Sequence, residues 1–399
     1  AFNITNGTLD LASFNLTADG AFTNGAGGTL KIQGGETVST IDTVTAGSTV
    51  IYNGTGSYTT ALAAGNTYSN LTFNGSGGVW EPNGAVTVNS NLTITAGTFD
   101  IDGQNLTVTS TFSNSDTIRL QGGETTVSLT MDTDSGTVIY DGTASYTGLK
   151  AGSTYNDLTF NGTGGTWTLG AALDVNDDLA LSAGTLDVSG SNYGITVGGD
   201  WTDTGAGAFT EGTGTVTFDG TGTLNSNEAF NNVTVNGSGI TTTLGAALDV
   251  NDTLTIAAGA LDVSGSNYGI TAKSWTDTGS GTFTEGSGTV TFDVAGGTIN
   301  SNETFENVTI NHAGTTTLGA ALDLDDTLTI TGGALDVSIS NYGITAKSWT
   351  DTGAGTFTEG SGTVTFDVTG GTINSNETFE NVTINHAGTT TLGAALDLD

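Results

Sequence analysis

The chain has 399 residues and a formal net charge of −36, because its 41 acidic side chains are opposed by only five Lys and Arg. This balance excludes nucleic acid as a partner, since a phosphate backbone binds basic surfaces that replace its counterions, and it disfavours anionic membrane surfaces. Only 12% of the residues are charged while 35% are hydrophobic, and the apolar residues alternate with Thr, Ser and Asn, which indicates an ordered chain.

The residue types favour strands and exclude thiol chemistry. There is no Cys, a single Pro and 63 Gly, a composition typical of many short strands joined by tight turns. No apolar run approaches the roughly 18 residues of a membrane-spanning helix, so we expect no membrane insertion. The chain begins at Ala1 without Met, as a mature secreted protein does once its signal peptide is removed, and as a recombinant or partial fragment also does. We therefore expect an extracellular or cell-surface location.

Internal repetition organises the whole chain. In the first half, QGGET recurs at Gln33 and Gln121, and LTFNG recurs at Leu71 and Leu158, which defines a long repeat. In the second half, LGAALD recurs at Leu169, Leu244, Leu318 and Leu392, which defines a short repeat. The sequence predicts five repeats in one continuous solenoid: residues 1–91, 92–178, 179–253, 254–327 and 328–399.

Within each repeat the hydrophobic period is two, as in TVTF and NVTIN. Strict alternation turns the apolar set to one side of a strand and the hydroxyl groups to the other, and the intervening GTG, GSG and AGG supply turns. We predict an all-β fold, a β-solenoid in which a short repeat forms about three coils of roughly 25 residues. The alternative is a tandem array of β-sandwiches, because a repeat approaches the size of an immunoglobulin-like domain.

The runs NLTITAGTFDIDGQNLTV and DTLTITGGALDVSISNYGIT carry a resemblance that covers the whole chain. They are similar to the large repetitive surface proteins of bacteria, the haemagglutinin-like exoproteins and autotransporter passengers. The resemblance rests on composition and periodicity and not on a motif. It implies a right-handed parallel β-helix, export from the cell, and a role in adhesion or scaffolding.

Three acidic clusters offer the closely spaced oxygen ligands that Ca²⁺ requires. They are LDVNDD at residues 173–178, LDVND at 248–252 and LDLDD at 322–326. They match neither a helix–loop–helix calcium loop nor the glycine-rich calcium nonapeptide. A calcium ion is therefore a possible ligand, the alternative is a solvated acidic edge that keeps the protein soluble, and no other cofactor is expected.

The residues with catalytic potential recur with the repeat. His312 and His386 lie in the turn-like INHAGTT, and Trp201, Trp275 and Trp349 lie in SWTDTG or the variant DWTDTG. A catalytic centre needs one arrangement of acid, base and pocket, so copying indicates architecture, and we expect no enzymatic activity and no catalytic residue. We expect the tryptophans to fill the core; their alternative role is stacking on sugar rings.

The two ends of the chain match in the repeat pattern. Phe2 and Ile4 align with Leu328 and Ile330. The sequence ends at ALDLD, and its last residue, Asp399, aligns with Asp325, which stands just before Leu328. Because a solenoid end is an open sheet edge, we predict that chains stack head to tail, with Phe2, Ile4, Leu396 and Leu398 at the junction. The alternative is an excerpt of a longer repeat protein.

The sequence as a whole predicts a non-enzymatic extracellular structural protein, the subunit or shaft of a filament whose partner is a second copy of itself. The alternatives are the stalk or carbohydrate-binding region of a cell-surface adhesin, which would bind host or matrix glycans, and a polysaccharide-acting β-helix enzyme. The absence of a non-repeated head disfavours the adhesin. The copying of every candidate catalytic residue disfavours the enzyme.

Overall fold

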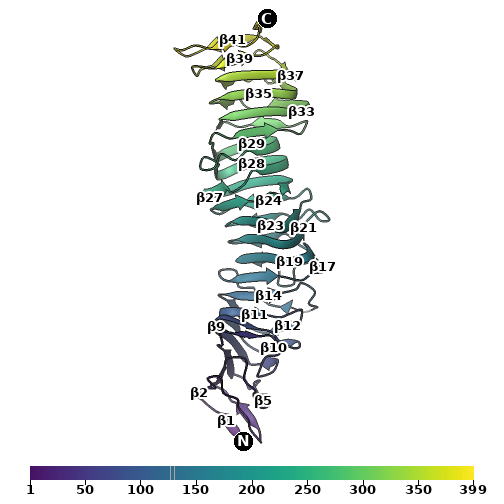
Figure 1. Ribbon diagram of the computed structural model, residues 1–399, viewed down its shortest axis with the longest axis vertical. Coiled ribbons are helices and arrows are strands. Elements are labelled where there is room, and N and C mark those ends of the chain that lie inside the picture. Colours follow the sequence, from purple (N-terminus) through teal and green to yellow (C-terminus); the bar gives the residue numbers. More distant parts are fainter. Residues whose placement is uncertain (126, 130) are drawn as a thin grey trace. The chain divides into compact units, whose positions relative to one another are not determined.

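The computed structural model describes residues 1–125, 127–129 and 131–399, and in these residues it contains strands, turns and bends but no helix. Neighbouring strands pair in parallel, and strands about twenty residues apart in the sequence stack on one another (Figure 1). The prediction of an all-β solenoid, a parallel β-helix built from tandem repeats, is confirmed. Parallel stacking rules out the β-sandwich alternative, because sandwiches are built from antiparallel sheets.

The chain divides into two compact units, and each is a stack of parallel strands. Unit 1 comprises residues 1–193 and 204–210, and unit 2 comprises residues 194–203 and 211–399. One strand, β23 (Trp201–Thr210), contributes residues to both units.

The strands of unit 1 are mostly short. They are β1 (Phe2–Ile4), β2 (Gly7–Asp10), β3 (Phe22–Asn24), β4 (Gly28–Ile32), β5 (Ile41–Asp42), β6 (Thr49–Tyr52), β7 (Ser57–Tyr58), β8 (Thr67–Tyr68), β9 (Asn70–Trp80), β10 (Val86–Val88), β11 (Leu92–Asp100), β12 (Leu106–Val108), β13 (Phe112–Asn114), β14 (Thr117–Leu120), β15 (Val127–Ser128), β16 (Thr137–Tyr140), β17 (Ser145–Thr147), β18 (Thr154–Tyr155), β19 (Asp157–Thr168), β20 (Leu173–Val175) and β21 (Leu179–Asp187).

Unit 2 contains several longer strands. They are β22 (Ile195–Val197), β24 (Thr215–Phe218), β25 (Gly222–Asn225), β26 (Ala229–Phe230), β27 (Asn232–Leu244), β28 (Leu248–Asp262), β29 (Ile270–Thr284), β30 (Thr289–Phe292), β31 (Thr298–Asn300), β32 (Thr304–Phe305), β33 (Asn307–Leu318), β34 (Leu322–Leu324), β35 (Thr327–Asp336), β36 (Ile344–Ala346), β37 (Ser348–Thr358), β38 (Thr363–Phe366), β39 (Thr372–Asn374), β40 (Thr378–Phe379), β41 (Asn381–Ile384), β42 (Thr391–Leu392) and β43 (Asp397–Leu398).

The coil length predicted from the sequence is wrong. In unit 2, one ladder pairs Thr271 with Thr291, Thr291 with Thr309, and Thr309 with Thr329, so one coil is shorter than predicted. Each coil carries three paired stretches; the coil that begins at Leu322, for example, closes when Ile344 pairs with it. Long strands such as β28 and β29 cover more than one stretch because they turn the corners through register shifts instead of breaking.

The short repeat does not equal a whole number of coils. One outward-facing ladder of unit 2 consists of Thr196, Thr217, Thr234, Thr255 and Thr276. A second ladder consists of the copies of these residues one repeat later, Thr271, Thr291, Thr309, Thr329 and Thr350. Thr271 and Thr276 lie on two different sides of the same coil. Each repeat therefore advances the surface pattern by one side of the solenoid.

The residue numbers agree with this rotation. Four coils separate Thr271 from Thr350 in the second ladder, whereas the copy of Thr271 one repeat later is Thr345. The short repeat thus ends about one side before four coils are complete. Thr345 begins the same pattern on a third side, where it pairs with Thr365, and Thr365 pairs with Thr383.

The core of each unit is a column of inward-facing aliphatic and aromatic side chains. The alternation read from the sequence decides which residues enter it: β30 and β38 bury Val and Phe and leave their threonines half-buried or exposed. The largest side chains with almost no exposed surface are the five tryptophans, Trp80, Trp167, Trp201, Trp275 and Trp349. The cores are therefore filled by side chains.

Candidate functional site

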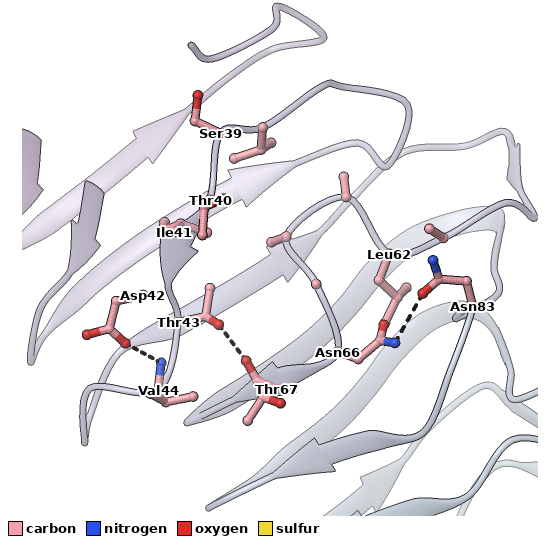
Figure 2. A pocket seen from close by; sticks show the side chains of 15 residues that line it. Ser39, Thr40, Ile41, Asp42, Thr43, Val44, Leu62, Asn66, Thr67 and Asn83 are labelled. Atoms are coloured by element: carbon pink, nitrogen blue, oxygen red, sulfur yellow. Dashed lines mark hydrogen bonds between the residues drawn. The ribbon is translucent and has the colours of Figure 1, made fainter. Parts of the chain in front are cut away.

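A large surface groove of unit 1 lies between the segments 38–44 and 61–67, with a volume of about 520 Å³ (Figure 2). Its polar groups are largely engaged with one another: Asn66 Nδ2 donates to Asn83 Oδ1 at 3.1 Å, and the backbone N of Val44 donates to Asp42 Oδ1 at 3.0 Å. Asp42 is its one acidic residue among those described, and they include neither a histidine nor an aromatic ring. The groove thus lacks an acid–base pair and a platform for sugar stacking.

A second groove of unit 1, of about 540 Å³, holds two carboxyl groups, those of Asp132 and Asp134. The hydrogen bond and the negative charge of Asp132 raise the pKa of Asp134. Carboxyl groups in direct contact are closer than the roughly 5 to 9 Å that glycoside hydrolysis requires between its acid and its base or nucleophile. A carboxyl pair with this contact does not match a glycosidase site.

The acidic clusters predicted as calcium ligands have different environments. Asp177 and Asp178, from the cluster at 173–178, lie with Asp157 of the preceding coil, and one oxygen of each lies within 4.8 Å of the others. In the two later clusters, Asp252 and Asp326 each form an ion pair: Lys273 Nζ lies 2.9 Å from Asp252, and Lys347 Nζ lies 3.2 Å from Asp326. Of the three clusters, only the first gathers three acidic ligand atoms among the described residues.

The histidines are held in local hydrogen bonds. The Nδ1 atom of His312 accepts from the backbone N of Gly314 at 2.9 Å, so its Nε2 carries the proton and donates to Thr316 Oγ1 at 2.7 Å. Burial lowers the pKa of His312, which favours this neutral form. His386 makes the same pair of contacts with Gly388 and Thr390. His312 lies within β33, at a corner, and not in the turn that INHAGTT suggested.

The tryptophans lie inside the core, as expected, and with less than 2% of their surface exposed they cannot stack on a sugar outside. Their indole N–H groups differ between the units. Trp80 and Trp167 donate to the backbone O of Gln33 and Gln121 at 2.8 and 3.1 Å. Trp275 and Trp349 have no hydrogen-bond partner for Nε1 among the described residues.

The residues predicted for the junction are mostly at the surface. Ile4 is buried in unit 1, while Phe2 is 43% exposed and packs edge-on against Phe22 at 5.1 Å between ring centroids. In unit 2, Leu398 is 54% exposed and Leu396 is half-buried.

Sequence reasoning missed two further exposed apolar residues of unit 2, Ile384 and Leu392, which are 49% and 54% exposed. Their copies one repeat earlier, Ile310 and Leu318, are buried. These two residues could have been found by comparing the repeats, because they stand at positions that carry core residues one repeat earlier.

Sequence reasoning also missed a set of buried aspartates in unit 2, each of which is influenced by a half-buried glutamate. Asp351 is 6% exposed, and neither of its carboxylate oxygens has a hydrogen-bond donor among the described residues. Burial, and then the charge and contact of Glu377, raise the pKa of Asp351 to about 6. Burial and Glu303 likewise raise the pKa of Asp277, its copy one repeat earlier. The signal in the sequence was an Asp at an inward position, two residues after a core Trp.

The fold and these sites define a parallel β-solenoid with filled cores, whose polar chemistry lies in repeated acidic groups and not in one pocket. Within the described residues, no helix is long and apolar enough to cross a bilayer. A scan against protein-family models, a search of curated proteins and a search of solved structures found no match to this chain.

Proposed function

We propose that this chain is a non-enzymatic, extracellular structural protein that forms the shaft of a filament by head-to-tail stacking with further copies of itself. The observation that carries the proposal is the rotation of the repeat pattern in unit 2, where the threonine ladder of one side, ending at Thr276, is copied on the next side from Thr271 onward. A pattern that turns about the axis distributes each surface group around the solenoid.

This distribution favours a shaft over a one-sided receptor or a catalytic centre. Trp275 pairs in the ladder of Leu254, whereas its copy Trp349 pairs in the ladder of Leu328, which lies on another side. Residues copied in this way do not gather at one place, so they cannot build one extended binding face or combine into one reaction site. They give each side of the shaft a similar surface.

Stacking between copies would use the same contacts as stacking within a chain. Ile310 is buried beneath Ile330 of the next coil, to which it is paired, whereas its copy Ile384 is half exposed. An open parallel edge with apolar side chains is a template for another strand. A second copy that places Ile4 over Ile384 would reproduce the Ile310–Ile330 pairing, because Ile4 is the sequence equivalent of Ile330.

A disulfide test follows from this register. Thr309 pairs with Thr329, so the same register places Asn3 of one copy beside Thr383 of another. Paired positions on adjacent strands are about 4.8 Å apart, which is within the range of a disulfide. Since the chain has no Cys, the double variant Asn3→Cys, Thr383→Cys should form covalent multimers on oxidation.

The matched control is Asn3→Cys with Thr365→Cys, because Thr365 lies one coil below Thr383. Its distance to Asn3 would be about 9.6 Å, beyond disulfide reach, so it should give no ladder of multimers. If both pairs stay monomeric in oxidised gels and electron micrographs show only single short particles, head-to-tail assembly is wrong. If multimers form but neither cysteine pair forms a disulfide, the proposed register is wrong while head-to-tail assembly stands.

A substitution that does not depend on cross-linking is Phe2→Asp. An unpaired charge at an apolar junction is costly, so the variant should form shorter filaments, measured by cryo-electron microscopy at matched concentration. Wild-type filaments should show a strand spacing of about 4.8 Å along their axis. Filaments of unchanged length in Phe2→Asp would contradict the proposed junction.

A further inference from the structure

The inner corners of unit 2 contain acidic oxygens that the proposed shaft does not use. Asp351 follows Trp349 on the inward side of β37, and its two carboxylate oxygens are enclosed without a hydrogen-bond donor from a described residue. The carboxyl of Glu377, from the coil above, lies against it. Two carboxyl groups from neighbouring coils therefore meet at one corner.

The position of Glu377 is fixed by local structure. In register, Trp349 pairs with Ile373 and Thr350 with Asn374, so the chain above continues over Asp351 at Ser375. Ser375 is buried, and its hydroxyl accepts a hydrogen bond from the backbone N of Glu377 at 3.1 Å. This turn holds the Glu377 carboxyl at the corner, where the half-buried side chain also reaches solvent.

The same corner occurs in three repeats. Asp277 and Asp203 are also more than nine-tenths buried, with both carboxylate oxygens lacking a hydrogen-bond donor in the described part of the chain. The charge of Glu303 acts on Asp277, and that of Glu228 acts on Asp203. The serine turn is repeated as well, since Ser301 and Ser226 accept from the backbone N of their glutamates at 3.0 and 3.1 Å.

Enclosed carboxylates need a cation or a proton, because an unpaired buried charge is strongly unfavourable. The nearest sequence cations, Lys273 and Lys347, are engaged with Asp252 and Asp326. Two carboxylates with water access from the glutamate side offer the hard oxygen ligands and the double negative charge that suit Ca²⁺.

We propose that these three corners, Asp203–Glu228, Asp277–Glu303 and Asp351–Glu377, are divalent-cation sites that bind Ca²⁺ and join adjacent coils of unit 2. In each corner the ion takes the place of the missing hydrogen-bond donors. The two carboxylates, which would otherwise repel each other across adjacent coils, become ligands of the same ion. The proposal is independent of the shaft function. The aspartates and glutamates of these corners are not those of the cluster of Asp157, Asp177 and Asp178.

The test uses the full chain at neutral pH and Ca²⁺ alone as the ligand. Equilibrium dialysis and calorimetry should show Ca²⁺ binding that the triple variant Asp203→Asn, Asp277→Asn, Asp351→Asn abolishes at these corners, and the melting temperature of the wild type should rise with Ca²⁺. The matched control is Asp177→Asn, Asp178→Asn, which removes the exposed cluster and should leave the corner sites intact.

A second readout locates the ion. Tb³⁺, which substitutes for Ca²⁺, should luminesce on tryptophan excitation, because Trp275 and Trp349 each lie two residues before a proposed ligand. The luminescence should persist in the Asp177→Asn, Asp178→Asn control. If the triple variant is poorly folded, Asp277→Asn alone should remove one third of the corner binding. Binding unchanged in the aspartate variants, or stabilisation by acid with no response to Ca²⁺, would overturn the proposal and leave a shared proton at each corner.

Discussion

The two units build the same kind of core but satisfy their buried polar groups differently. In unit 1, the buried carboxylate of Glu124 accepts from the backbone N of Gln121 and Gly122 at 2.7 and 2.8 Å, and Glu36 does the same for Gln33 and Gly34. In unit 2, Asp277 and its copies have no such donors among the described residues.

The aromatic groups repeat this contrast. In unit 1, the hydroxyls of Tyr140 and Tyr155 lie 3.2 Å apart in the core, and burial raises the pKa of Tyr140 to about 12, so it stays protonated and can donate. The indoles of Trp80 and Trp167 are also paired, whereas Trp275 and Trp349 in unit 2 lack a partner among the described residues. Unit 2 thus holds inward groups that require a ligand or cost stability.

The largest expected effect is on unit 1. Glu124→Ala would leave the backbone N–H groups of Gln121 and Gly122 without this acceptor, and losing two bonds to a charged group should cost about 4 kcal/mol of unfolding free energy. Urea unfolding followed by circular dichroism measures it. The control is Glu124→Gln, which keeps one acceptor oxygen and should lose less. Equal losses would show that the backbone bonds are not the cause.

The opposite sign is expected in unit 2. In the presence of a chelator at neutral pH, Asp351→Asn removes a charge that is enclosed beside Glu377 and should stabilise the unit. The pKa of about 6, against the ordinary value of 3.8, corresponds to at most about 3 kcal/mol, and solvent on the glutamate side reduces it. Thermal unfolding with and without chelator measures the change. A destabilised variant under chelator would mean that Asp351 has a favourable partner, and the contrast between the units would fail.

A smaller difference should separate two tryptophan variants. Trp80→Phe and Trp275→Phe remove similar buried apolar surface, but only Trp80 loses a hydrogen bond, the one to Gln33 O. Trp80→Phe should therefore lose about 1 kcal/mol more of unfolding free energy than Trp275→Phe. Urea midpoints of the two variants provide the comparison. The reverse order would show that the unit 2 indole is not an unsatisfied donor.

The last expected effect is a pH dependence at Asp141 in unit 1. Burial, and then the charge of Asp100, raise the pKa of Asp141 to about 6, although Arg119 lies 3.3 Å away and opposes the shift. The folded state therefore binds more protons than the unfolded state between about pH 4 and 6. Stability should fall as the pH rises through this window, and Asp141→Asn should flatten the curve. Identical pH slopes for the two proteins would contradict this.

The sequence predicted the inward and outward residues well but not the path of the coil. Alternation in TVTF correctly placed Val290 and Phe292 in the core and Thr291 outside. The coil length was wrong because the repeat was assumed to hold a whole number of coils. A polar inward residue such as Asp351 was missed because its sequence neighbours do not show what lies above it.

By itself, the sequence determined the strand-rich composition, the long and the short repeat, and the alternation that builds a solenoid core. The composition and the repeats can be read directly from the chain, and the alternation depends only on neighbours two residues apart. Only the tertiary structure decided that the short repeat is about one side short of four coils, and that Asp351 meets Glu377. Both depend on which residues about twenty positions apart are paired. This register is set by the number of residues that the chain uses at each corner of the coil. The rotation of the pattern and the corner sites follow from that register.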